Sequence, residues 1–151
     1  MRGELQRLTD NIISIAKAAR TETQIGFNPL SVSGLSLKIV QEIFEDPAKQ
    51  NLTIVGAGQM AISVIENFYD NGITKINAVN RSKKILTIND FLSIETTPLS
   101  QLGNIIQNTD NLVTSINSPL PIIGKGLIEQ AMKERKNKPM LLIDLGVPRN
   151  I

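Results

Sequence analysis

NLTIVGAGQMAISVIENFYDNGITKINAVNRS, residues 51–82, is the stretch that decides the fold, because its order predicts a strand, a glycine turn, a helix and a second strand. The apolar residues Leu52, Ile54 and Val55 precede the turn GAGQMA at 56–61, and apolar residues then recur at helical spacing as far as Tyr69. A G-x-G-x-x-G/A pattern between a strand and a helix indicates dinucleotide binding. The alternative is a glycine-rich turn that holds no ligand.

Each small residue of this turn has a physical role in the dinucleotide interpretation. Gly56 permits the tight turn out of the strand, Gly58 leaves room for a pyrophosphate against the backbone, and Ala61 lets the helix pack closely on the strand. The free N–H groups at the helix start, at the positive end of its dipole, would face the phosphates. We therefore predict cofactor contacts from the whole turn, which comprises Gly56, Ala57, Gly58, Gln59, Met60 and Ala61.

The end of the second predicted strand, residues 75–79, favours NADP over NAD. Folds that bind NAD usually place Asp or Glu about 20 residues after the glycines, where the carboxylate holds the ribose 2′-hydroxyl. Here the strand is followed by Asn80, Arg81, Ser82 and Lys83. A carboxylate would repel a 2′-phosphate, whereas an arginine and a hydroxyl can bind one. We therefore predict NADPH as the cofactor, with these four residues at its adenosine ribose. A solvated basic loop is the alternative.

Composition is that of one soluble domain. The chain has 151 residues, of which 41% are hydrophobic and 20% are charged, and its net charge of +2 is too small to indicate nucleic-acid binding. No apolar run approaches the roughly 18–20 residues of a membrane span, and the N-terminus has no secretory pattern. We expect a cytoplasmic protein without membrane or direct nucleic-acid contacts.

The chain contains neither cysteine nor histidine. Disulfides, thiolate catalysis and cysteine-based metal sites are therefore excluded for this polypeptide, and the commonest acid/base residue is missing. If the chain belongs to an enzyme, the chemistry must come largely from the cofactor or from segments outside this sequence. We predict no catalytic residue and no metal site within it.

The remaining sequence predicts further helices and strands. Strands that alternate with helices imply a parallel sheet with right-handed crossovers. The prediction is a Rossmann-type doubly wound α/β fold with strand order 3-2-1-4-5 and one or two extra N-terminal helices. The second helix is expected to start at Ser31 or Ser33 and to pack beside the first strand. Expected helices cover 3–20, 31–46, 83–92, 98–106 and 125–136, and expected strands cover 52–55, 75–79, 93–97, 111–115 and a buried 140–144.

The fourth predicted strand ends in Thr114 and Ser115. At the carboxyl end of a parallel strand such small polar residues face the ligand crevice. We expect them beside the nicotinamide half of the cofactor, and the alternative is an ordinary strand end.

Several motifs together resemble those of glutamyl-tRNA reductases. They are the glycine turn, the Asn-Arg-Ser loop, ARTETQI at 19–25, SVS at 31–33 and IDLGVPR at 143–149. The similarity covers nearly the whole chain but only the middle portion of that family's length. Shikimate dehydrogenases share the glycine turn and Asn-Arg-Ser, whereas Thr-Glu-Thr and Val-Pro-Arg favour the reductases.

The resemblance implies NADPH-dependent reduction of glutamyl-tRNA to glutamate-1-semialdehyde, the entry step of tetrapyrrole and heme synthesis. In that family a cysteine of an N-terminal catalytic domain forms a thioester, NADPH in a second domain delivers hydride, and a C-terminal helical domain makes the homodimer. We expect residues 1–30 to be a linker helix and crossing segment from a missing catalytic domain, and 31–151 to be the NADP-binding domain. Alone, the chain should bind cofactor but be inactive, since glutamyl-tRNA would be bound through the missing domain.

Two alternatives belong to other classes. An enzyme similar to shikimate dehydrogenase or ornithine cyclodeaminase would need a substrate domain with a Lys/Asp pair, and about 50 residues before the first strand leave no room for one. A non-catalytic NAD(P)-binding regulatory module usually keeps an acidic residue where this chain has Asn80 and Arg81. Neither Asp144 nor Arg149 is predicted to be catalytic. Asp144 is expected to accept N–H groups of the following turn, and Arg149 to be solvated, although either could instead serve the cleft.

Overall fold

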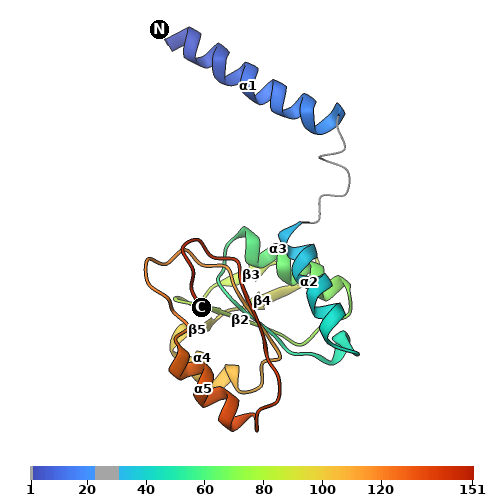
Figure 1. Ribbon diagram of the computed structural model, residues 1–151, viewed down its shortest axis with the longest axis vertical. Helices are drawn as coiled ribbons and strands as arrows, with labels where there is room; N and C mark the ends of the chain where they lie inside the picture. Colours follow the sequence, from blue (N-terminus) through green and yellow to red (C-terminus); the bar gives the residue numbers. More distant parts are fainter. Residues whose placement is uncertain (1, 23–30) are drawn as a thin grey trace. The chain divides into compact units, whose positions relative to one another are not determined.

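The computed structural model describes residues 2–22 and 31–151. The chain divides into two compact units, Met1–Ser31 and Val32–Ile151. The first unit contains one helix, α1 (Arg2–Glu22), which confirms the helix predicted over 3–20 (Figure 1). Its apolar side chains Leu8, Ile12 and Ile15 are 59–69% exposed. The rest of the polar connection, residues 23–30, including the last residue of the Thr-Glu-Thr motif, lies outside the described residues.

The second unit is built on a five-stranded parallel sheet of order β5-β2-β1-β6-β7. Numbered along the chain, these strands have the order 3-2-1-4-5, so the predicted doubly wound topology is confirmed. The strands are β1 (Leu52–Val55), β2 (Ile76–Asn80), β5 (Thr97–Pro98), β6 (Asn111–Thr114) and β7 (Leu141–Asp144). The helices are α2 (Val32–Ile43), α3 (Gln59–Asp70), α4 (Leu102–Ile106) and α5 (Lys125–Glu134), with short 3-10 turns at Pro47–Lys49 and Leu99–Gln101.

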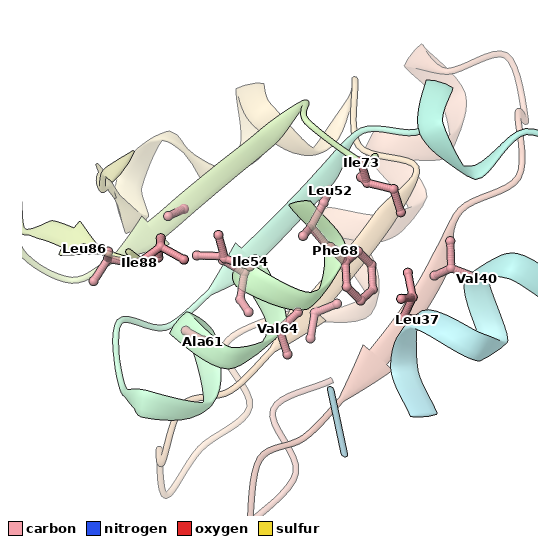
Figure 2. Close-up of a cluster of buried hydrophobic side chains, with 13 residues drawn as sticks. Leu37, Val40, Leu52, Ile54, Ala61, Val64, Phe68, Ile73, Leu86 and Ile88 are labelled. Carbon is pink, nitrogen blue, oxygen red and sulfur yellow. The ribbon is translucent and has the colours of Figure 1, made fainter. Parts of the chain in front are cut away.

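Helices cover both faces of this sheet, with α2 and α3 on one side and α4 and α5 on the other (Figure 1). Alternate residues of each strand therefore enter different cores. Ile54 packs with Val64 and Phe68 of α3, as Figure 2 shows, whereas Val55 packs with Leu102 and Ile106 of α4. Because both faces of the sheet are covered, β1 and β6 are buried at every position rather than at alternate ones.

Helix α2 packs chiefly against α3 rather than beside the first strand as we expected. Leu37 and Val40 enter the same core as Phe68 (Figure 2). The hydroxyls of Ser33 and Ser63 lie 3.0 Å apart and join the two helices. Ser33 is therefore a buried packing residue inside α2. Of the two predicted start residues, Ser31 is the one that directly precedes the helix.

The segment 83–97 differs from the prediction. A helix over 83–92 is wrong, because β3 (Ile85–Thr87) and β4 (Ser93–Glu95) form an antiparallel hairpin. A third sheet strand over 93–97 is also wrong in part, since only Thr97–Pro98 joins the main sheet, beside β2. The reason is local: Ile85 is 71% exposed, Leu86 is 3% exposed, and the Asn89 side chain accepts the N–H groups of Phe91 and Leu92 in a turn. Alternating burial and an Asn turn are typical of a hairpin.

Strand β7 is half-buried rather than buried as predicted. It lies at the edge of the sheet and pairs with β6 alone in the part of the chain that the structure describes. Across residues 2–22 and 31–151, no helix combines the length and the apolar composition of a membrane span.

The register of the sheet brings the carboxyl ends of four strands to one edge. Val55 pairs with Val79 of β2 and with Thr114 of β6, which in turn pairs with Asp144 of β7. The residues that follow these strands are therefore neighbours, although they are far apart in sequence. In an open α/β sheet this edge is where ligands bind.

Candidate cofactor site

The glycine turn leaves β1 directly against the end of β6. Gly56 has a φ of 135°, and its N–H donates to the Val79 carbonyl at 2.8 Å. The Ser115 N–H donates to the Val55 carbonyl at 2.9 Å. A Cβ on Gly56 would lie 2.5 Å from Ser115 Oγ and 3.1 Å from its carbonyl oxygen. Both the backbone angle and this close approach require glycine.

The start of α3 is open. Gly58 is its N-cap residue, no side chain caps the helix, and a Cβ on Gly58 would meet no atom within 4 Å. Gln59 and Met60 are exposed, and the first turn carries no acidic residue. The first N–H groups of a helix have no partner inside it, so this end can receive an anion. Ala61 is fully buried, which supports its predicted packing role, and Ala57 is half-buried.

A pocket of about 290 Å³ lies at the carboxyl edge of the sheet. Its wall combines the ends of β1 and β2 with the loop that follows β6. Of the predicted site residues, Asn80 and Arg81 line it. The full lining is Val55, Asn80, Arg81, Leu99, Ile116, Asn117, Ser118 and Ile122.

Sequence reasoning missed the part of this wall that comes from residues 116–122. The prediction at the end of β6 stopped at Ser115, although the rule that ligands bind beyond the carboxyl ends of strands applies to the following loop as well. Leu99 was placed in a helix by its apolar period, yet it lies at the start of a 3-10 turn and faces the pocket.

The basic loop after β2, residues 81–84, carries three cations, of which only Lys83 has an ion pair among the described residues. The side chains of Arg81, Ser82 and Lys83 are all exposed. Lys83 Nζ lies 3.5 Å from Glu95 Oε1 of β4, whereas Arg81 forms no ion pair within the described part of the chain. Asn80 Nδ2 donates to the Ser82 carbonyl at 3.1 Å, which closes a local turn. Of the three, Arg81 is therefore the residue best placed to meet an anion in the pocket.

The two hydroxyls at the end of β6 differ in their surroundings. Thr114 is buried, and its hydroxyl donates to Asp144 Oδ1 at 2.5 Å, so it serves a contact inside the protein. Ser115 Oγ is buried beside Gly56 and has no hydrogen-bond partner among the described residues. A buried hydroxyl without a partner is costly. Ser115 is therefore the better candidate of the two for a ligand contact at the turn.

Asp144 organises the turn that follows β7. Its carboxylate accepts the N–H groups of Gly146 at 2.9 Å, Asn150 at 2.6 Å and Ile151 at 3.2 Å, besides the Thr114 hydroxyl. Burial alone would raise the pKa of Asp144, but these hydrogen bonds outweigh it and hold the pKa below its ordinary value. The expected structural role of Asp144 is confirmed.

Asn150, whose N–H donates to Asp144, also forms hydrogen bonds with the loop that lines the pocket. Its side-chain amide donates to the Ile116 carbonyl at 2.9 Å, and its own carbonyl accepts the N–H groups of Ile122 and Ile123. Both ends of the pocket loop are thus held from one residue. Arg149 beside it is exposed, as expected.

The comparisons with known proteins agree with this geometry. A family model described as shikimate / quinate 5-dehydrogenase matches residues 38–151. The chain is 36% identical, along its whole length, to a glutamyl-tRNA reductase of Pseudoalteromonas atlantica, and 38% identical over 98% of its length to one of a Marinomonas species. It spans 36% and 35% of the length of these two relatives. They confirm the resemblance that the motifs predict.

Two solved structures share the fold. The glutamyl-tRNA reductase from Methanopyrus kandleri superposes with a TM-score of 0.69 at 24% identity, over 92% of this chain and 35% of that one. An NADPH-dependent glyoxylate/hydroxypyruvate reductase from Sinorhizobium meliloti gives a TM-score of 0.52 at 17% identity, over 93% and 52%. At these identities the likeness shows that the chain shares their fold.

Proposed function

The chain belongs to the shikimate / quinate 5-dehydrogenase family, and from that premise we propose that it is the NADPH-binding domain of a glutamyl-tRNA reductase. The observation that carries the proposal is the meeting of three features at one edge of the sheet. They are the tight turn at Gly56, the open start of α3 at Gly58 and, on the wall of the pocket, Arg81, which has no ion pair among the described residues. Their chemistry matches a pyrophosphate and a 2′-phosphate.

In this proposal the α3 N-terminus, with Gly58, Gln59 and Met60, holds the pyrophosphate. Arg81 and Ser82 bind the 2′-phosphate, and Lys83 adds charge only as far as its pair with Glu95 allows. The loop 116–118 and Ser115 flank the nicotinamide side. The cofactor, when bound, would supply a hydride. The residues of this chain would orient the cofactor and neutralise its phosphates.

We place the acyl chemistry outside residues 31–151, because the chain has no cysteine or histidine. Residues 1–30 would connect the domain to the catalytic part, which binds glutamyl-tRNA, and the complete enzyme would be a homodimer that serves tetrapyrrole synthesis. The open reading frame upstream of codon 1 should then encode a cysteine in a Ser/Thr-Cys-Asn-Arg setting. A stop codon directly before Met1 would contradict the linker.

A shikimate-dehydrogenase-like enzyme is the less favoured alternative. The match to the family model alone would fit this alternative, since shikimate dehydrogenases and glutamyl-tRNA reductases share the glycine turn. The 36–38% identity to glutamyl-tRNA reductases extends through α1, upstream of the residues that the model matches. That extension favours the reductase.

Calorimetric titration of the 151-residue chain tests the cofactor. NADPH should bind more tightly than NADH, and ATP should bind weakly. Arg81→Ala should weaken NADPH by about 10- to 150-fold, since a charged hydrogen bond contributes about 1.5–3 kcal/mol, and it should leave NADH unchanged. Lys75→Ala, which removes an exposed cation just before β2, is the matched control and should change neither the NADPH affinity nor the NADH affinity.

A preference for NADH in the unmodified chain would exclude the NADP assignment. Equal losses for both cofactors in Arg81→Ala would make that residue structural. Lys83→Ala should have a smaller effect than Arg81→Ala, because the pair with Glu95 already offsets part of the charge of Lys83.

A further inference from the structure

One buried threonine, Thr96, forms hydrogen bonds with the backbone of the basic loop that follows β2. Thr96 is 1% exposed and lies between β4 and β5. Its hydroxyl donates to the Ser82 carbonyl at 3.1 Å and accepts the Lys84 N–H at 2.8 Å. Its own N–H donates to the Lys84 carbonyl at 2.8 Å. Three hydrogen bonds thus fix the backbone on both sides of Lys83.

These bonds place the residues proposed to meet the 2′-phosphate. The Ser82 carbonyl also accepts the Asn80 side chain, so two donors hold one peptide group in place. Arg81 lies between Asn80 and Ser82 and lines the pocket at the carboxyl edge of the sheet. The Arg81 side chain has no ion pair in the described residues. The position of its guanidinium before a ligand binds therefore depends on the backbone that carries it.

Only a hydroxyl can serve both neighbours of Lys83 at once. The Ser82 carbonyl needs a donor and the Lys84 N–H needs an acceptor, and both lie within reach of one side-chain atom. Serine could replace threonine in this role, whereas valine has the same shape but no polar atom. A loop that is already ordered in its binding form loses less entropy when the ligand arrives.

We propose that Thr96 is a positioning residue for cofactor choice, which holds the loop 81–84 ready for a 2′-phosphate. The inference rests on the proposed NADPH site and adds a residue that does not touch the cofactor. The pair between Lys83 and Glu95 strengthens the argument. Because Glu95 offsets part of the charge of Lys83, we expect discrimination to depend more on the position of Arg81 and Ser82 than on Lys83.

The test compares Thr96→Val with Thr96→Ser in the complete 151-residue chain. Dissociation constants for NADPH and NADH are measured by calorimetry, and stability is measured by urea unfolding. Thr96→Val removes both hydrogen bonds of the hydroxyl and should weaken NADPH binding by about 3- to 10-fold, because the loop is then less ordered before the ligand arrives, while NADH binding changes little. Thr96→Ser should restore the ratio of the two constants. Thr87→Val, on the exposed face of the same hairpin, is the matched control and should keep both values.

Two results would overturn the inference. One is that neither dissociation constant changes in Thr96→Val while the unmodified chain selects NADPH normally, which leaves the proposed function intact. The other is an equal loss for both cofactors, which would make Thr96 a folding residue only. Absence of NADPH binding in the unmodified chain would instead overturn the proposed function and this inference with it. If Thr96→Val does not fold, Thr96→Ala removes the hydroxyl without placing a methyl against the Ser82 carbonyl. The NADPH and NADH dissociation constants of Thr96→Ala then decide between these outcomes.

Discussion

Replacing Asp110 with alanine should destabilise the Val32–Ile151 unit by about 3–5 kcal/mol, because it leaves a buried guanidinium without its counter-charge. Arg135 Nη2 lies 2.9 Å from Asp110 Oδ1, and their side chains are 2% and 4% exposed. Urea unfolding, with the slope of the transition compared between variants, measures the loss.

The cost is large because this pair joins three elements at the amino edge of the sheet. Asp110 Oδ2 accepts the Asn51 N–H just before β1, at 3.0 Å. The Arg135 guanidinium, at the end of α5, also donates to the carbonyls of Gln107 at 3.1 Å and Pro139 at 2.9 Å. The amino ends of β1 and β6 and the entry to β7 would all lose their common anchor.

The pH dependence has a defined sign. Burial alone would raise the pKa of Asp110, but the hydrogen bonds from Arg135, Asn51 and Lys138 outweigh it and hold the pKa below its ordinary value. A lowered carboxylate pKa stabilises the fold above the unfolded-state pKa of about 3.9, and this stabilisation is lost as the pH falls through the folded-state pKa. The difference in stability between the unmodified chain and Asp110→Ala should therefore shrink below about pH 4.

Lys138→Ala is the matched control for this ion pair. Lys138 Nζ lies 3.2 Å from the same carboxylate oxygen, but its side chain is 66% exposed. An exposed pair contributes about 0–1 kcal/mol, so this variant should unfold close to the unmodified chain. A loss of less than about 1 kcal/mol in Asp110→Ala would show that the buried pair is replaceable.

Local patterns account for what the sequence predicted well in the fold. The strand, turn and helix of residues 51–82 carry their own periodicity and glycines, so β1, α3 and β2 follow from neighbouring residues alone. The hairpin of residues 85–95 has only three residues in each strand, and the third sheet strand has two. Stretches that short hold too few alternations to distinguish a strand from a helical turn.

Contacts between distant residues account for what the sequence did not show. Asp110 and Arg135 are 25 positions apart, and each alone is typical of a solvated surface. Asn150 holds the pocket loop at Ile116 from 34 positions away. The predicted ligand groups at Gly58 and Arg81 lie where local rules placed them, whereas the groups that position them, Thr96 and Asn150, depend on the assembled sheet.

Gly56→Ala should be the second severe substitution, with a loss of about 2–6 kcal/mol. A φ of 135° is strained for any residue with a Cβ, which contributes about 1–3 kcal/mol. The new methyl would also lie 2.5 Å from Ser115 Oγ, with the backbone of that residue at 3.1 Å, and such overpacking costs about 1–3 kcal/mol more. Ser115→Ala in the same chain should recover part of the loss, since it removes the closest atom and leaves the strained angle.

Gly58→Ala separates this structural demand from ligand binding. A methyl there meets no protein atom within 4 Å, and the residue has an ordinary φ of −94°. Stability should fall by less than about 1 kcal/mol, the small cost of alanine at an N-cap. NADPH binding should weaken about 10-fold or more, because the methyl occupies the space where a pyrophosphate would approach, and an added methyl in a close contact costs about 1–3 kcal/mol. Unchanged affinity in a folded Gly58→Ala chain would show that the phosphates do not lie at this turn, and it would move the cofactor away from the start of α3.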